Sequence, residues 1–270
     1  MGTISGYSEE EEKKKDLFIA NETEIVLNPD RFGQKSSVLH FLYAPSEAQN
    51  GFYSVTVSED GADIDTCGWE DLPCLIIHKA TATKHKDTVT LSLLAKSHSP
   101  EDTQTTIDSS LTVSGSGDET HPVRKTVNKI GTSAIFVVSS GEVQFSSIVF
   151  LLNSSPDSLL AGSLFEHTGG KLTLTHVTVK PDEKLAADSQ LSLGEHSLIS
   201  ISAGLTTSFN IIVERISTTQ NGASVCATLN KKSSLTFAPT ASFTNCTALY
   251  GGAIYIQLQE TPSTLSFNHI

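Results

Sequence analysis

The sequence predicts an all-β solenoid, in which short strands wind into coils that stack on one another. Apolar residues alternate with Ser, Thr or charged residues along much of the chain, which is the period-2 pattern of strands. Strand pairs recur together with their corners at offsets of 29, 32 and 34 residues. One such coil cannot bury its apolar face alone, so neighbouring coils must cover it. An antiparallel sandwich also has closely spaced strands, but nothing in it requires corner and strand pair to recur together.

The repeat is clearest in two consecutive copies. An offset of 29 relates four apolar residues to four others, namely Val143, Phe145, Ile148 and Phe150 to Leu172, Leu174, Val177 and Val179. Adding a further 34 to Leu172 and Leu174 gives Thr206 and Ser208, which are polar. We therefore expect the third copy to be degenerate at these two positions. Residues 235–243 resume the pattern, and Gly141 and Gly170 mark the corner in the first two copies.

The composition along the chain divides it into three segments. Residues 1–16, in which four Glu precede three Lys, are expected to form a charged disordered tail. Residues 17–80 are expected to hold N-terminal strands at 25–27, 38–43 and 52–57, and a short helix after Pro73 that covers the first open end. Residues 81–270 form the coils, with the polar insertion 114–129 projecting from one corner. We interpret the chain as truncated at its C-terminus.

A motif near the C-terminus shows how one coil is built. Its members are Phe243, Asn245, Gly251, Gly252, Ala253 and Ile254. The glycine pair fits a sharp corner before an alternating strand, and Asn245 can adopt the left-handed conformation.

This motif resembles the repeats of chlamydial polymorphic outer-membrane proteins. The upstream run from Phe52 to Ala80, with Cys67-Gly68 and Pro73-Cys74, resembles the N-terminal cap of pectin-lyase-like parallel β-helix proteins. The two resemblances together span residues 50–270. They imply a right-handed parallel β-helix with a short N-terminal capping helix, displayed on a cell surface or secreted.

The charge of the chain argues against two kinds of partner. Net charge is −12, and the only arginines are Arg31, Arg124 and Arg215, so no basic face for nucleic acid or anionic membrane is visible. No apolar run approaches the roughly 20 residues that span a bilayer, so we expect no direct membrane insertion. The N-terminus lacks the apolar region of a secretory signal. Either the protein is cytoplasmic, or the chain lacks its true start and is extracellular, which we favour.

The four cysteines fall into two pairs along the chain, Cys67 with Cys74 and Cys226 with Cys246. Without a Cys-x-x-Cys motif, a zinc site has little support. An even, paired count suggests disulfides in an oxidising compartment, and the alternative is free thiols packed as small apolar groups. Glycosylation sequons begin at Asn21, Asn153 and Asn245, which would make a secreted protein a glycoprotein.

No catalytic or cofactor site is expected from the motifs. The fold that the resemblance implies has members that cleave acidic polysaccharides, but their Gly-His-Gly and Arg-x-Lys signatures are missing from this sequence. Arg124 and Lys125, in a polar loop, and Arg215, at a strand end, have no matching acidic trio. We interpret them as solvated surface charges.

Two clusters suggest metal chemistry. The densest acidic group, Glu59, Asp60, Asp63 and Asp65, could hold Ca²⁺, although an Asp-rich turn is the blander explanation, which we favour. His167 and His196 lie 29 residues apart and could stack on adjacent coils, while His176 is another strand residue. Because no Cys or carboxylate joins them at ligand spacing, we favour surface or strand-edge histidines.

The expected function is that of a non-catalytic secreted or cell-surface domain, adhesin-like, binding a carbohydrate or a host or cell-surface protein. The alternatives are a polysaccharide lyase or glycoside hydrolase, and a structural segment of a larger surface protein. A groove with at least two carboxylates and one Lys or Arg on adjacent coils would favour the enzyme.

Overall fold

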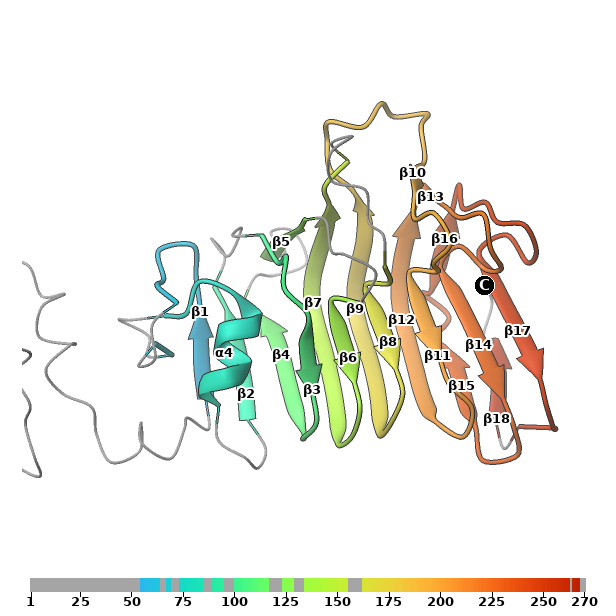
Figure 1. The fold of residues 1–270 in the computed structure, drawn as a ribbon, viewed down its shortest axis with the longest axis horizontal. Coiled ribbons are helices and arrows are strands. Elements are labelled where there is room, and N and C mark those ends of the chain that lie inside the picture. Colours follow the sequence, from blue (N-terminus) through green and yellow to red (C-terminus); the bar gives the residue numbers. More distant parts are fainter. Residues whose placement is uncertain are drawn as a thin grey trace, which may run out of the picture.

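The computed structural model describes residues 54–63, 67–68, 73–84, 89–94, 100–116, 123–128, 134–154, 162–262 and 264–267. The tail 1–16 and the strands predicted at 25–27 and 38–43 lie outside these residues. Figure 1 shows short strands along the described chain and one short helix between the first two. The elements are β1 (Ser54–Val57), α4 (Ile77–Thr83), β2 (Val89–Leu93), β3 (Thr105–Ile107), β4 (Leu111–Gly115), β5 (Val123–Val127), β6 (Phe136–Val138), β7 (Glu142–Leu152), β8 (Phe165–His167), β9 (Lys171–Pro181), β10 (Leu191–Ser192), β11 (Ile199–Ile201), β12 (Thr206–Glu214), β13 (Ile216–Ser217), β14 (Val225–Leu229), β15 (Ser234–Phe237), β16 (Ser242–Thr244), β17 (Ile254–Leu258) and β18 (Thr264–Phe267).

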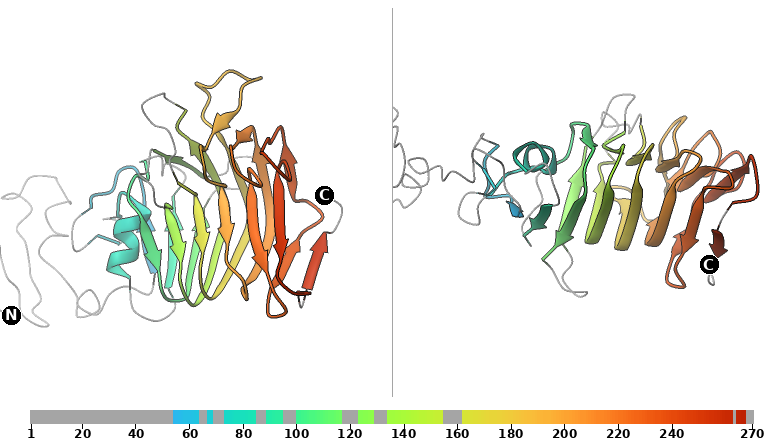
Figure 2. Two further views of the ribbon diagram at one scale, coloured as in Figure 1. Left: turned by 45° about the vertical axis from the view of Figure 1, so that its right-hand side comes forward. Right: turned by 90° about the horizontal axis from the view of Figure 1, so that it is seen from below.

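The strands form parallel sheets that run along the stack. The ten-stranded sheet has the order β1-β2-β4-β7-β9-β12-β15-β18, with β5 beside β7 and β16 beside β12. The six-stranded sheet has the order β3-β6-β8-β11-β14-β17, and β10 pairs with β13. From β3 onward the chain passes repeatedly between the two larger sheets, which face each other along the stack (Figure 2). Two strands in a row, β4 with β5 and β15 with β16, belong to the ten-stranded sheet, and β10 and β13 lie outside both larger sheets. The described part of the chain is therefore an all-β solenoid, as the sequence predicted.

The register confirms the predicted offsets. Val143 pairs directly with Leu172 in parallel strands, and Phe145 pairs with Leu174. The six-stranded sheet follows the same offset, since Phe136 lies opposite Phe165. Apolar residues thus stack into inward-facing columns in which each coil covers its neighbour.

The third copy is not degenerate, contrary to the prediction. The offset of 34 placed Thr206 and Ser208 opposite the first two apolar positions of β9, but Thr207 and Phe209 occupy them. Both side chains are buried. The inward column therefore continues through this coil, with one hydroxyl group in it.

The cause is a single corner residue. Within β9, His176 adopts a left-handed conformation with φ 52°. β12 has no counterpart of His176, so its register with β9 shifts between Asn210 and Ile211. The offset is 34 on one side of this corner and 35 on the other, which no constant spacing could describe.

Part of the polar insertion 114–129 forms regular structure, which the sequence did not suggest. Its described residues include the end of β4 and all of β5, and β5 pairs in parallel with β7. Val123, Lys125 and Val127 are buried within it. The prediction of a projecting loop is therefore wrong for residues 123–127.

Aromatic rings fill the middle of the stack. Phe136, Phe145, Phe150 and Phe165 are completely buried, and every pair of these rings has centroids between 5.0 and 6.2 Å apart. They come from both larger sheets, so their contacts join the two walls of the solenoid.

The corners that lead into β7 and β9 require glycine, as predicted. Gly141 and Gly170 both have φ 75°. A Cβ on Gly170 would clash with the carbonyl oxygen of Gly141, which accepts a hydrogen bond from the backbone of Lys171. Two effects therefore disfavour a side chain at Gly170, namely the close stacking of the coils and the left-handed backbone conformation.

Gly170→Ala should lower the free energy of unfolding by about 2–3 kcal/mol, because it combines backbone strain with a clash in the stack. Gly194→Ala is the matched control, since Gly194 has φ 64° but a Cβ added there would meet no atom within 4 Å. Its strain alone should cost about 1 kcal/mol. Urea unfolding of both variants measures the difference, and equal losses would contradict the steric role of Gly170.

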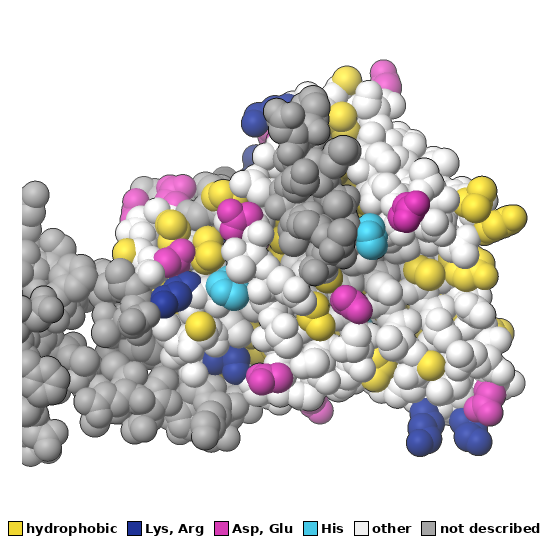
Figure 3. All heavy atoms as spheres, viewed as in Figure 1, with side chains coloured by type: hydrophobic (Ala, Val, Ile, Leu, Met, Phe, Trp, Pro, Cys, Tyr) yellow, Lys and Arg dark blue, Asp and Glu magenta, His cyan; other side chains and the backbone are white. Residues whose placement is uncertain are grey.

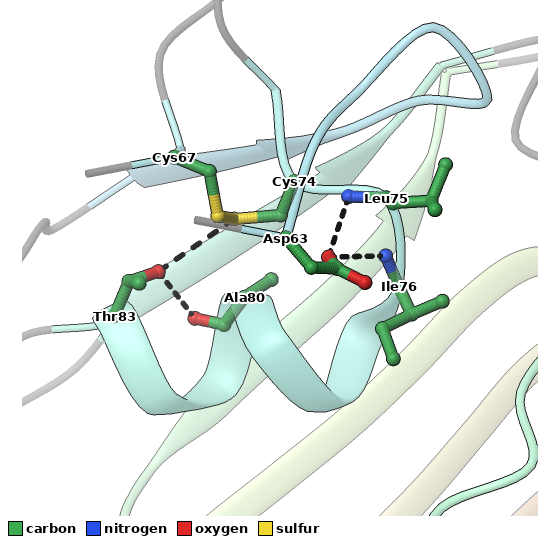
Figure 4. Close-up of a disulfide and its surroundings, with 7 residues drawn as sticks. All are labelled: Asp63, Cys67, Cys74, Leu75, Ile76, Ala80 and Thr83. Atoms are coloured by element: carbon green, nitrogen blue, oxygen red, sulfur yellow. Dashed lines mark hydrogen bonds between the residues drawn. A yellow bond between two sulfur atoms is a disulfide. The ribbon is translucent and has the colours of Figure 1, made fainter. Parts of the chain in front are cut away.

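The described N-terminal part is tied together around α4. Cys67 and Cys74 form the predicted disulfide, with Cα atoms 4.9 Å apart. Asp63 Oδ1 accepts hydrogen bonds from the backbone nitrogens of Leu75 at 2.9 Å and Ile76 at 3.3 Å (Figure 4). The helix follows Pro73 as predicted and contacts β1, β2 and β3, of which β1 and β3 are terminal strands of their sheets.

Candidate functional site

A polar pocket of about 250 Å³ opens on the outer side of the six-stranded sheet. Ser200 on β11 and Cys226 on β14 lie opposite each other in register at its floor. The residues that line it are Ser163, Glu195, His196, Ser197, Ser200, Gln220, Asn221 and Cys226. They come from three successive coils, so the pocket exists only because the coils stack.

The loops around the pocket are held by hydrogen bonds between coils. The hydroxyls of Thr218 and Thr219 both donate to the carbonyl oxygen of Gly194, at 2.8 and 2.9 Å. The Ser197 hydroxyl donates to the carbonyl oxygen of Asn221 at 2.8 Å. The polar side chains of the pocket are therefore presented by loops that are already fixed to one another.

The chemistry of the lining is that of hydrogen bonding rather than of ion binding. Hydroxyl and amide groups predominate, and each can both donate and accept. Glu195 is the single carboxylate among the eight lining residues, and none of the eight is Lys or Arg. The lining therefore lacks the two carboxylates and the cation that we required for polysaccharide cleavage.

Cys226 and Cys246 are free thiols, so the predicted disulfide between them is wrong. Cys226 is on the outward side of β14, in register with Ser200 and Tyr255. Cys246 follows β16 of the other sheet and donates to the carbonyl oxygen of Val213. Cys226 therefore lies on the six-stranded sheet, whereas Cys246 lies next to the ten-stranded sheet.

The Cys226 thiol is poorly suited to nucleophilic chemistry. Burial raises its pKa, and a hydrogen bond with Ser197 opposes this only in part. A thiol with a raised pKa stays protonated at neutral pH, whereas the thiolate is the reactive form. Although Cys226, His196 and Glu195 line one pocket, the pocket does not supply an activated thiol.

His167 is buried in the core, contrary to the surface or strand-edge prediction. Its Nε2 donates to the carbonyl oxygen of Gly170 at 3.3 Å, and its Nδ1 lies 3.1 Å from the hydroxyl of Thr207. His196 lines the pocket, and His176 is exposed at its corner. His167 pairs with Ile201 in the next coil, so the suggested stacking of His167 on His196 does not occur.

Burial lowers the pKa of His167, and hydrogen bonds to the backbone of Gly170 and Gly169 oppose this. Below about pH 6.5 the unfolded chain takes up a proton that folded His167 does not, so stability should fall as the pH falls. We therefore expect His167 to lower the free energy of unfolding as the pH falls below about 6.5.

His167→Gln should remove that part of the pH dependence, because Gln can hydrogen-bond in the same place without titrating. His176→Asn is the control, since an exposed histidine at a left-handed corner should leave the slope unchanged. Urea unfolding across the pH range measures both slopes. A slope that persists in His167→Gln would show that other groups cause it.

Lys125 and Glu101 form a buried ion pair, which corrects the prediction that Lys125 is a solvated surface charge. Lys125 was expected on the surface, but its Nζ lies 2.9 Å from Glu101 Oε1 and both side chains are fully buried. The same Oε1 accepts from the backbone nitrogen of Ile77 at 2.7 Å, and Lys125 Nζ donates to the carbonyl oxygen of Leu75 at 3.4 Å. The pair thus connects β5 to the start of α4, where Ile76 provides no side-chain cap.

The other basic residues of the prediction behave as surface groups. Arg124 forms an exposed ion pair with Glu183 at 3.3 Å. Arg215 has φ 59° at a corner and donates to the carbonyl oxygen of Ala186 at 3.0 Å. Neither of them lines the pocket.

The C-terminal motif builds the corners that the sequence predicted. Asn245 has φ 52°, and Gly251 and Gly252 have φ 75° and 52° shortly before β17. The carbonyl oxygen of Ala253 accepts from the backbone nitrogens of Ser224 and Val225, which fixes this corner to the coil before it. Phe243 and Ile254 pack against the hydrophobic core.

The sequon asparagines differ in their surroundings. Asn245 is exposed, and Gln190 Nε2 donates to its Oδ1 at 2.8 Å. Asn153 uses its own Nδ2 to donate to Asn128 Oδ1 at 2.9 Å, and Asn21 lies outside the described residues. Glycosylation remains a prediction for all three, with Asn245 the more accessible of the two described.

The acidic cluster is only partly described, since Asp65 lies outside the described residues. Asp63 uses one oxygen to fix the loop before α4, and Glu59 and Asp60 are exposed. Within the described part of the chain, no group of three or more His, Cys, Asp or Glu residues is placed to hold a metal ion. Calcium binding here remains a prediction.

Comparison with protein-family models, with curated proteins and with solved structures gives no significant match for this chain. In the residues that the structure describes, no helix combines the length and apolar character needed to cross a membrane. The pocket gathers hydroxyl, amide, imidazole and carboxylate side chains from three coils, and sequence reasoning missed it. Its residues come from loops of unequal length, so no regular pattern in the sequence marks them.

Proposed function

We propose that the chain is a non-catalytic domain of a secreted or cell-surface protein that binds a glycan or a surface protein through the pocket. The fold proposed is a right-handed parallel β-helix of the pectin-lyase-like type, with α4 as its N-terminal cap. Right-handed connections are strongly preferred between parallel strands, which supports the handedness. The Cys67–Cys74 disulfide supports an oxidising compartment.

The observation that carries this proposal is the composition of the pocket. Its lining offers hydroxyl and amide groups on loops that are fixed to one another, which suits recognition of a polar ligand. Hydrolysis of a glycosidic bond ordinarily requires two carboxylates, and the lining supplies one. A raised thiol pKa keeps Cys226 in its protonated, less reactive form at neutral pH.

The test applies a glycan array, a panel of surface proteins and a polysaccharide-cleavage screen to one preparation of the chain. We expect binding without cleavage. Gln220→Ala should weaken that binding about tenfold, which corresponds to the loss of one or two hydrogen bonds. Gln257→Ala is the matched control, because Gln257 is exposed on β17 outside the pocket. Cleavage of any polysaccharide by the purified chain would overturn the non-catalytic function.

A further inference from the structure

The surface that holds the pocket continues onto the next coil, where its chemistry changes. Asn221 forms a parallel bridge with Tyr250, and the backbone nitrogen of Leu249 donates to the carbonyl oxygen of Gln220 at 2.8 Å. On the sheet itself, Cys226 lies in register with Tyr255. The three positions that Gln220, Asn221 and Cys226 occupy in the pocket are therefore filled on the next coil by Leu249, Tyr250 and Tyr255. We call these three residues the aromatic rim.

The aromatic rim exposes apolar surface beside a polar pocket. Leu249 and Tyr250 are 64% and 62% exposed, the largest values among the exposed large hydrophobic residues described. In Figure 3, hydrophobic side chains gather at the right-hand end of the face that carries β11 and β14. Tyr255 of the rim, like Leu258, is on β17, and Leu265 and Phe267 are on β18; these are the terminal strands of their sheets. Leu249 and Tyr250 lie in the segment before β17, beside Gln220 and Asn221 of the pocket.

The charges around the pocket discriminate against an acidic ligand. Glu195 lines it, and Glu166 on β8 lies in register with Ser200 at the floor. Neither the lining nor the aromatic rim contains Lys or Arg. A polyuronate would bring negative charge to Glu195 in the lining and close to Glu166 on the neighbouring strand, with no cation in the lining or the rim, which is unfavourable.

A neutral sugar satisfies both halves of this surface. Its hydroxyl groups can exchange hydrogen bonds with Ser, Gln and Asn side chains, while the apolar face of its ring can pack on a Tyr ring. The pocket volume of about 250 Å³ lies below the roughly 300–1,000 Å³ of sites for drug-sized ligands, so it suits one sugar residue of a chain. We propose that the pocket and the aromatic rim together form a subsite for a neutral, uncharged saccharide. This inference rests on the proposed function and names its ligand class.

The test uses the purified chain with neutral xylo-, cello- and manno-oligosaccharides and with oligogalacturonates as the acidic comparison. We expect at least one neutral series to bind, with oligogalacturonates at least tenfold weaker. Tyr250→Ala should weaken binding of the neutral ligand about tenfold by titration calorimetry. Leu258→Ala is the matched control, because Leu258 is 58% exposed at the far end of β17 from the register position of Cys226.

The outcomes separate this inference from the proposed function. Preference for oligogalacturonates, or equal effects of Tyr250→Ala and Leu258→Ala, would overturn the neutral-sugar subsite while leaving a binding domain. Binding of a surface protein but of no saccharide would do the same. Cleavage of any oligosaccharide, or binding of neither saccharides nor surface proteins, would overturn the proposed function itself.

Discussion

Lys125→Met is expected to lower the free energy of unfolding by about 3–5 kcal/mol, because it leaves the buried Glu101 carboxylate without its partner. The effect should be large because both side chains are fully buried and Glu101 Oε2 has no hydrogen-bond partner of its own among the described residues. Met preserves much of the length and apolar surface of the Lys stem, so packing changes little. Chemical denaturation of the variant and the parent chain measures the loss.

Two further variants make this prediction specific. Lys171→Met removes an exposed pair in which Lys171 Nζ lies 3.7 Å from Glu142 Oε2, and should cost less than about 1 kcal/mol. The double variant Lys125→Met with Glu101→Gln should recover part of the loss, because Gln is neutral and can still accept from the Ile77 backbone. Similar losses in Lys125→Met and Lys171→Met would contradict a structural role for the buried pair.

Phe145→Ala should cost about 3–5 kcal/mol, because it opens a cavity among rings from both walls of the solenoid. The Phe145 ring is 5.1 Å from that of Phe136 and 5.0 Å from that of Phe165, measured between centroids. The coils around it are closely stacked, as Gly170 shows, so little collapse can fill the space.

Phe267→Ala provides the control for this substitution. Phe267 continues a column of rings, with its centroid 5.2 Å from that of Phe237, but its side chain is 47% exposed on β18. Truncation there should cost about 1 kcal/mol, since little cavity forms at an open surface. A smaller loss at Phe145 than at Phe267 in urea unfolding would contradict the view that stability is concentrated in the middle of the stack.

The fold could be predicted from the sequence because its columns are linear patterns. Neighbouring coils place apolar residues opposite one another in parallel register, and Val143 with Leu172 is the simplest case. Charge was a poorer guide. Lys125 alternates with Val123 and Val127, so its inward position was visible in the pattern, but only the three-dimensional pairing with Glu101 makes its burial acceptable.

The pocket could not be predicted for a different reason. Glu195, His196, Gln220 and Asn221 come together through loops whose lengths differ from coil to coil. Cys226 and Cys246 illustrate the same problem, since their placement suggested a pair, whereas Cys226 lies on β14 of the six-stranded sheet and Cys246 follows β16 of the ten-stranded sheet. Sequence periodicity identifies which side of a strand a residue occupies, but it does not say which loops meet above it.

The missing counterpart of His176 in β12 has a consequence for how such chains diverge. The inward-facing residues of β9 and β12 stay in register on both sides of the position of His176. One residue can therefore be inserted or deleted at this position while the inward columns of the solenoid stay aligned. Selection then acts on which side chains stack, while the residue count per turn is free to drift. Descendants of a common ancestor would lose their shared spacing long before they lost their shared shape.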